Sequence, residues 1–197
     1  MAKKQKLIIL IIIILVLVGG GLFYWWQNRE IKGSPEDYVI KETGAGVFVE
    51  NKKAGLTVKV PEGWEVKKIE LLEGSIVFYT PDIEGKKQNE IITPPLEKGC
   101  GIETAVVYKK MDFEEMKKGI EAMHSGLGIK SDKFELITIN NQQALKNTFD
   151  SIISGPSVNV CFTQKNKLYS FGIFWGPDEK EQCIGRFDEF LETVSIK

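Results

Sequence analysis

Histidine and cysteine are the residue types from which nucleophilic or metal chemistry would first be argued, and this chain contains few of them. His124 is the only histidine, and Cys100, Cys161 and Cys183 are the only cysteines. Together they offer a Cys₃His set for zinc, but structural zinc sites normally include a close cysteine pair, and no C-x-x-C occurs here. A Cys–His nucleophilic pair also lacks a local signature. We therefore expect no metal, no cofactor and no catalytic residue from this set.

The sequence motifs of the common catalytic sites are also missing. There is no G-x-S-x-G and no H-E-x-x-H, and Gly44-Ala45-Gly46 lacks the later glycine and the helix start that a phosphate-binding loop needs. His124 is predicted in the last turn of a helix, where a partial positive charge interacts favourably with the helix dipole. Carboxylates and serines are plentiful, so an enzyme that uses only those groups stays open.

The three cysteines allow at most one internal disulfide and one thiol. Cys161 falls in the middle of a predicted strand, where a lone cysteine behaves as a small buried hydrophobe. Cys100 and Cys183 fall at the ends of predicted elements, where loops can bring them together. Three pairings are possible, and spacing alone does not choose among them. Our hypothesis is a Cys100–Cys183 disulfide, which export to an oxidising compartment would favour.

Aromatic side chains are candidates for the lining of a binding pocket. Tyr169, Phe171, Phe174 and Trp175 lie on one predicted strand. Aromatic residues in strands more often belong to the core, and we expect that role for them. We expect Trp64 to cover a sheet edge.

The N-terminal segment has the length and composition of a membrane anchor. Residues 7–18 are unbroken Leu, Ile and Val, and residues 7–26 carry no charge. As a helix, this stretch reaches about 30 Å, the thickness of the hydrocarbon core. Tyr24, Trp25 and Trp26 stand where an interfacial aromatic belt belongs. We predict a single-pass transmembrane signal-anchor helix over residues 7–26, which would contact membrane lipid.

Charge sets the predicted orientation of this anchor. Lys3, Lys4 and Lys6 precede the apolar run, whereas the other flank mixes both signs. Residues 1–6 are therefore expected in the cytoplasm, with the rest of the chain outside it, in the cell membrane or envelope. A cleaved signal peptide is the alternative, since Val18-Gly19-Gly20 offers small residues near a cleavage point.

The charge balance argues against nucleic acid as a partner. Without the three N-terminal lysines, 23 of the 26 basic residues remain against 27 acidic ones. Nucleic-acid binders usually show a basic patch or stripe, so we expect no nucleic acid here.

Beyond the anchor, residues 27–46 resemble a linker, and residues 47–197 have the patterns of one globular domain. Gly33-Ser34-Pro35 and Gly44-Ala45-Gly46 suggest loops. Strands are predicted over 56–60, 75–80 and 102–108 because apolar residues alternate or cluster there. Residues 82–98 are expected to form a charged, proline-containing excursion.

The second half of the domain shows clearer signals. Asp112 and Glu115 have the spacing of a helix capping box. Two strand pairs are predicted to turn at residues 140–141 and 165–166. A closing helix presents an apolar face formed by Ile184, Phe187, Leu191 and Val194. Short connections favour antiparallel pairing, so we predict an α+β domain with an antiparallel sheet flanked by helices.

Residues 55–64 carry a family resemblance. The sequence Gly55-Leu56-Thr57-Val58-Lys59-Val60-Pro61-Glu62-Gly63-Trp64 resembles the opening of PsbP-like domains, in which an amphipathic strand precedes Pro-x-Gly-Trp. The order of elements up to the closing helix agrees with that family over residues 47–197. The resemblance implies an α/β/α sandwich around an antiparallel sheet.

The same resemblance also bears on function. The family includes the extrinsic photosystem II subunit, eukaryotic proteins that bind the GTPase Ran, and exported bacterial proteins of unknown role. It transfers no catalytic residue to this chain, so it favours a binding module over an enzyme by analogy.

Two functions therefore remain. We expect a membrane-anchored extracytoplasmic binding or accessory module with a protein partner in the cell envelope, and the alternative is a hydrolase-type envelope enzyme. The exposed sheet edge or the loop around Pro94-Pro95 is expected to carry the contact with the partner.

Overall fold

The computed structural model describes residues 31–69, 75–88, 91–109, 111–126, 129–151 and 155–197. The predicted anchor over residues 7–26 lies outside these ranges. Within them, no helix has both the length and the apolar character needed to cross a membrane.

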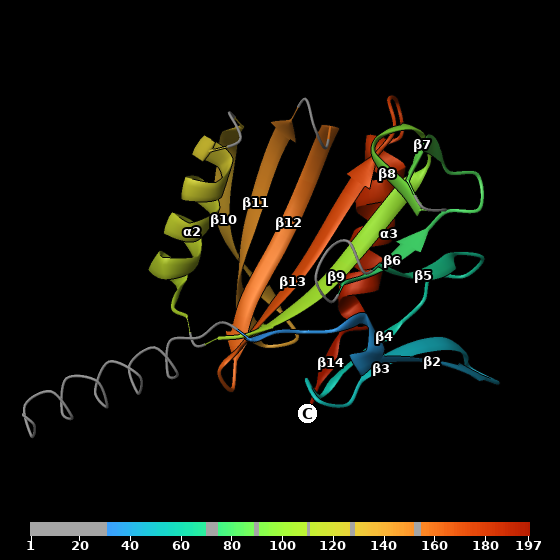
Figure 1. The fold of residues 1–197 in the computed structure, drawn as a ribbon, viewed down its shortest axis with the longest axis horizontal. Helices are drawn as coiled ribbons and strands as arrows, with labels where there is room; N and C mark the ends of the chain where they lie inside the picture. The colour runs from blue at the N-terminus through green and yellow to red at the C-terminus, as the bar shows by residue number, and fades with distance from the viewer. Residues whose placement is uncertain (1–30, 70–74, 89–90, 110, 127–128, 152–154) are drawn as a thin grey trace, which may run out of the picture. The chain divides into compact units, whose positions relative to one another are not determined.

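The largest element is an eight-stranded sheet in which every strand pair along the main path is antiparallel. The path runs through β10 (Lys130–Ile139), β11 (Gln142–Ser151), β12 (Gly155–Gln164), β13 (Lys167–Trp175), β9 (Cys100–Tyr108), β6 (Ser75–Tyr79) and β5 (Glu65–Ile69). The eighth strand, β1 (Ile31–Lys32), pairs with β9 off this path. Figure 1 shows the central strands side by side.

Two smaller sheets complete the β structure. The four-stranded sheet has the order β14 (Ser195–Ile196), β4 (Leu56–Lys59), β3 (Gly46–Asn51) and β2 (Tyr38–Thr43). The two-stranded sheet is the hairpin of β7 (Glu84–Gln88) and β8 (Ile91–Lys98).

The interpretation of residues 27–46 as a linker is wrong for the part that the structure describes. The compact unit begins at Lys32 rather than Val47. Ser34 caps a short 3₁₀ helix, η1 (Pro35–Asp37), since its side chain accepts from the Glu36 amide while Asp37 accepts from the Ser34 amide. Tyr38 then enters the main core with 1% of its surface exposed. Glycine, serine and proline here form a cap, not a flexible joint.

The charged, proline-containing excursion expected over residues 82–98 contains two paired strands, β7 and β8. Their register passes from Gly85↔Leu96 to Lys86↔Thr93. Pro94 and Pro95 therefore lie in a bulge without ladder partners, where proline is tolerated because no N–H is needed. The hairpin buries Ile92 in a small cluster on the sheet.

The predicted hairpin turns are confirmed. Asn140 and Asn141 have φ of 48° and 64°, and Lys165 and Asn166 have φ of 50° and 60°. Positive φ at both central residues defines the type I′ turn, whose twist matches that of the flanking strands.

The two helices lie on opposite faces of the main sheet. α2 (Phe113–Gly126) begins at the predicted capping box, and its Met116 packs with Cys161 of β12. α3 (Lys180–Glu192) places Phe190 in the main core, which includes Phe162. Cys161 and Phe162 are successive residues of one strand, so their side chains point to opposite faces. The predicted α+β class with an antiparallel sheet and flanking helices is confirmed.

Candidate functional site

His124 lies in the last turn of α2, as predicted, but its environment differs from the expected one. Only 2% of the residue is exposed, and its ring centroid lies 4.5 Å from that of Phe149 on β11. Burial lowers the pKa of His124 from its usual value. The imidazole therefore packs against a neighbouring ring, and the charged form that would interact with the helix dipole is disfavoured.

The structure joins Cys100 and Cys183 in a disulfide, with the two Cα atoms 5.7 Å apart. This is the pair that the positions at element ends favoured. The bond connects the first residue of β9 to the first turn of α3, and both cysteines are buried.

Cys161 is a buried free cysteine, in the environment expected for a small hydrophobe. Burial raises the pKa of its thiol to about 11. A thiol with so high a pKa is a poor nucleophile at neutral pH. Among the residues that the structure describes, no group of three or more His, Cys, Asp or Glu side chains is placed to hold a metal ion.

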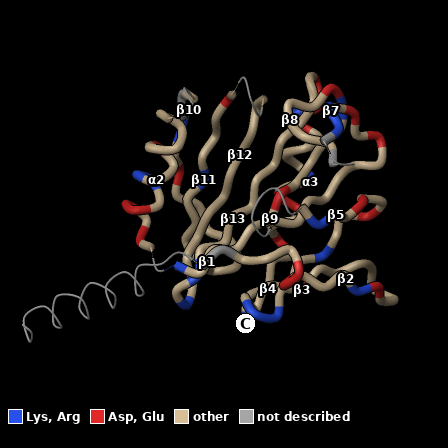
Figure 2. Tube along the Cα trace, in the orientation of Figure 1, with Lys and Arg blue, Asp and Glu red and all other residues tan. Residues whose placement is uncertain are grey.

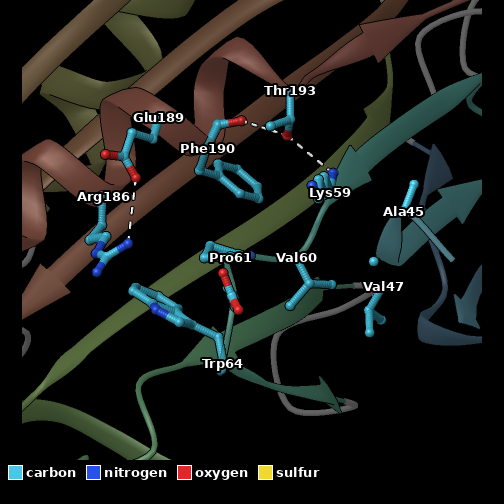
Figure 3. A pocket seen from close by; sticks show the side chains of 13 residues that line it. Ala45, Val47, Lys59, Val60, Pro61, Trp64, Arg186, Glu189, Phe190 and Thr193 are labelled. Carbon is cyan, nitrogen blue, oxygen red and sulfur yellow. Dashed lines mark hydrogen bonds and ion pairs between the residues drawn. The ribbon is translucent and has the colours of Figure 1, made fainter. Parts of the chain in front are cut away.

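The described residues form a cleft of about 550 Å³, which we call the Trp64 cleft. Three segments enclose it: the turn between β2 and β3, the connection from β4 to β5, and the C-terminal half of α3. Figure 3 shows Trp64 and Val60 on one side of the hollow, with Arg186, Glu189 and Phe190 of α3 on the other. The cleft thus combines aromatic and charged side chains from distant parts of the chain.

Local sequence explains how Trp64 reaches this position. The Trp64 amide donates to the Pro61 carbonyl at 3.1 Å, closing a four-residue turn. Gly63 has φ +78°, and the third position of a type II turn requires such a value. Trp64 is partly buried and packs against the main core directly before β5, the last strand on that side of the sheet. This placement agrees with the expected cover for a sheet edge.

The end of α3 is held against β4 by one hydroxyl group. Thr193 Oγ1 donates to the Phe190 carbonyl at 2.8 Å and accepts from the Lys59 amide at 3.0 Å. The cleft therefore has a fixed wall at this end, as the dashed lines of Figure 3 indicate.

Two exposed charges at the rim of the cleft form an ion pair. Arg186 Nη1 lies 3.6 Å from Glu189 Oε2, and the two side chains are 46% and 72% exposed. Such a surface pair contributes only about 0–1 kcal/mol, so its members can exchange partners at small cost. The cleft offers both signs of charge beside an aromatic surface.

A second exposed feature is the β2 strand, which ends the four-stranded sheet. Val39 and Ile40 of this strand are 44% and 41% exposed. This edge corresponds to the expected exposed sheet edge. The expected Pro94-Pro95 loop is instead the bulge of β8.

The sequence alone does not reveal the Trp64 cleft. The Pro-Glu-Gly-Trp turn carries the family resemblance, and this turn is the sequence feature that could have indicated the cleft. The other walls, from residues 45–47 and from α3, meet it only in the tertiary structure.

Charge is mixed over the described surface. Figure 2 shows basic and acidic residues interspersed along the helices, the β7–β8 hairpin and the turns. Strand β12 contains no charged residue.

Comparison with solved structures shows which fold this chain has. No family model matches the sequence, and no curated protein matches it. The cyanobacterial PsbP protein CyanoP of Synechocystis sp. PCC 6803 has a similar solved structure, with a TM-score of 0.53 and 10% identity over 86% of this chain and 94% of that one. The chain therefore has a PsbP-like α+β fold, as the resemblance of residues 55–64 indicated.

Two further solved structures are similar at lower TM-scores. LpqN of Mycobacterium tuberculosis, described as involved in cell envelope biogenesis, has a TM-score of 0.47 and 10% identity over 88% of this chain and 95% of its own. A Pseudomonas aeruginosa protein described as a putative regulator of unknown function has a TM-score of 0.48 and 10% identity over 81% of this chain and 97% of its own.

Proposed function

We propose that this protein is a membrane-tethered accessory module that binds a protein partner outside the cytoplasm. The apolar segment over residues 7–26, with lysines on its N-terminal side only, supports the tether and its orientation. The Cys100–Cys183 disulfide supports an oxidising compartment. The PsbP-like fold supplies the rigid body that the tether would carry.

The observation that carries the proposal is the Trp64 cleft. Tryptophan and arginine are the residue types that most often dominate binding energy at protein interfaces, and both line this cleft. We propose that it accepts a segment of an envelope protein that inserts an apolar side chain beside Trp64. Flanking charges of that segment would exchange with the Arg186–Glu189 pair.

Tethering makes even a weak contact effective. A partner in the same membrane meets the anchored domain at a raised effective concentration, so a modest affinity suffices. We infer an accessory role from this arrangement, because the Trp64 cleft offers a contact surface to a partner held in the same membrane.

Site-specific photo-crosslinking in cells tests this function. A photoreactive amino acid at position 189, at the rim of the cleft, should yield a reproducible set of crosslinked proteins in the membrane fraction. The same group at position 136 is the matched control, because Leu136 of β10 is 65% exposed and does not line the cleft. Trp64→Ala should abolish the products from position 189.

Two results would contradict the proposal. One is an identical set of products from both positions, and the other is a set that survives both Trp64→Ala and removal of the anchor. Saturable turnover of a small substrate by the purified protein would move it to the alternative class of envelope enzymes.

A further inference from the structure

A second concavity lies on the sheet face opposite α3, and we call it the Glu103 trough. Its volume is about 310 Å³, near the lower end of the range for small-molecule sites. Met123 of α2 and Pro94 of β8 stand at its walls, and β12, β13 and β9 form its floor. In Figure 1, α2 and the β7–β8 hairpin lie on either side of these strands.

The strand register explains the shape of the floor. Asn159 of β12 lies opposite Gly172 of β13, which in turn lies opposite Glu103 of β9. Residues opposite each other share a face, so Gly172 leaves a gap between an amide and a carboxylate. A Cβ built on Gly172 would meet nothing closer than Asn159 Oδ1 at 3.9 Å.

Neither backbone conformation nor close packing explains a glycine at this position. The φ of Gly172 is not positive, and a Cβ there would make no contact tighter than an ordinary van der Waals one. Glycine in a strand interior weakens the strand and often marks the close approach of a ligand or another backbone. The gap is therefore a candidate position for a ligand group.

Glu103 gives this space its chemical character. Ser75 Oγ donates to Glu103 Oε1 at 2.8 Å, and in the described part of the chain no lysine or arginine pairs with this carboxylate. Burial raises the pKa of Glu103, and the hydrogen bond from Ser75 opposes that shift. A partly buried carboxylate without a cation is unfavourable unless a ligand supplies the missing positive charge.

The remaining walls are largely apolar. Met123, Phe149, Phe174 and Pro94 surround the gap, and Glu103 is the one charged residue among those that line it. Met123 is 53% exposed, so a ligand in the trough could contact its side chain. Methionine is flexible and polarizable, so it adapts to ligands of varied shape.

We propose that the Glu103 trough binds a primary ammonium group carried on an apolar body. The ammonium group donates to the free carboxylate oxygen of Glu103. The apolar body lies over Gly172 between Met123 and Phe174. This inference does not depend on the Trp64 cleft, because the two sites share no lining residue.

Methyl NMR of the full chain in lipid nanodiscs, labelled at its methionine methyl groups, tests the proposal. Titration with n-hexylammonium should shift the Met123 signal saturably, with a dissociation constant of about 1–10 mM for a fragment of this size. Hexanoate, which has the same length and the opposite charge, should give no saturable shift. A capped peptide with one central lysine tests whether a protein-borne ammonium also binds.

Variants separate the parts of the site. Glu103→Gln should weaken hexylammonium binding by about 10-fold or more, because a charged hydrogen bond is lost. Gly172→Val should block the gap while leaving the carboxylate in place. Glu62→Gln, in the Trp64 cleft, is the matched control and should bind as the unchanged protein does.

Equal saturable binding of hexanoate would overturn the proposal, as would unchanged hexylammonium binding in both Glu103→Gln and Gly172→Val. If Glu103→Gln alters the whole methionine spectrum, Gly172→Val decides the outcome, since a Cβ at position 172 makes only an ordinary van der Waals contact, with Asn159 Oδ1 at 3.9 Å. A Met123 signal that moves without saturation also contradicts a defined site.

Discussion

Glu103 is the residue at which binding and stability are expected to oppose each other. Its pKa is raised by burial, so the folded protein holds the proton more tightly than the unfolded chain does. Below the unfolded pKa of about 4.3, both states are protonated and the carboxyl imposes no penalty. As pH rises from there through the pKa of the folded protein, the unfolded chain loses its proton first and the free energy of unfolding falls. Above the folded pKa this decrease is complete.

Glu103→Gln should therefore raise the free energy of unfolding at pH 7 and leave it unchanged near pH 3. Tyr38 and Tyr79 also interact electrostatically with Glu103, and the pKa of each tyrosine is raised, so both stay neutral over this range. Urea unfolding of the full chain in detergent, followed by tryptophan fluorescence at both pH values, measures the difference. A loss of stability at pH 7 would show that the carboxylate has a favourable partner in the folded protein.

Gly63 should be sensitive to substitution because its φ of +78° is unfavourable for other residues. Gly63→Ala is expected to lower the free energy of unfolding by about 1–2 kcal/mol and to misplace Trp64. Gly185→Ala, in the exposed face of α3, should instead stabilise by about 0.5–1 kcal/mol. Urea denaturation of both variants provides the test, and equal effects would exclude the turn as the cause.

At the scale of elements, β2 determines where the folded domain begins. It pairs with β3 from Tyr38↔Asn51 to Thr43↔Gly46, and Tyr38 is buried in the main core. A chain that starts at residue 47 would lose this strand and leave β3 as an exposed edge.

A fragment of residues 31–197 should accordingly fold, whereas one of residues 47–197 should be strongly destabilised or aggregate. The single substitution Tyr38→Ala should act in the same direction and lower the free energy of unfolding by about 3–5 kcal/mol, as truncation of a buried aromatic side chain does. Tyr38→Phe is the control, since it keeps the buried ring and removes only the hydroxyl, which donates to the Thr104 carbonyl at 3.5 Å. Circular dichroism and urea midpoints of the purified proteins measure these differences. Equal stability of the two fragments would restore the linker interpretation.

The disulfide connects β9 to α3 across 83 residues of sequence, which makes it an element-scale constraint. Replacing both Cys100 and Cys183 by alanine should lower the free energy of unfolding by about 2–5 kcal/mol. Cys161→Ala is the control, and it removes only a small buried side chain.

Thiol mapping of the protein isolated from cells gives an independent check of the same bond. Without reductant, the denatured protein should expose one alkylatable thiol, at Cys161, and with reductant three. Three alkylatable thiols without reductant would mean that the bond does not form in the cell.

At the scale of the whole molecule, the proposed tether and the folded domain act together. Protease added to spheroplasts should cleave between the anchor and the domain and release the domain intact. Protection until the cells are lysed would overturn the proposed orientation. Release without protease would instead favour the cleaved signal peptide.

The sequence determined those features that depend on short stretches of chain. The Asp112–Glu115 capping box, the two-residue turns at 140–141 and 165–166, and the apolar face of α3 each depend on neighbouring residues. The α+β class follows from these signals because short connections favour antiparallel pairing. The cysteine positions at element ends suggested the Cys100–Cys183 pair as a hypothesis but did not choose it among the three possible pairings.

The tertiary structure alone decided what distant segments do together. Residues 34–43 and 82–98 carry residues that favour loops. The described parts of both stretches are nevertheless ordered, because a helix cap and a strand bulge accommodate these residues and core burial outweighs their weak local preference. Both concavities arise where strand register and helix placement bring remote residues together, as with Trp64 and Arg186, or Glu103 and Gly172. Register depends on contacts summed over the whole sheet, so no single stretch of the sequence specifies these sites.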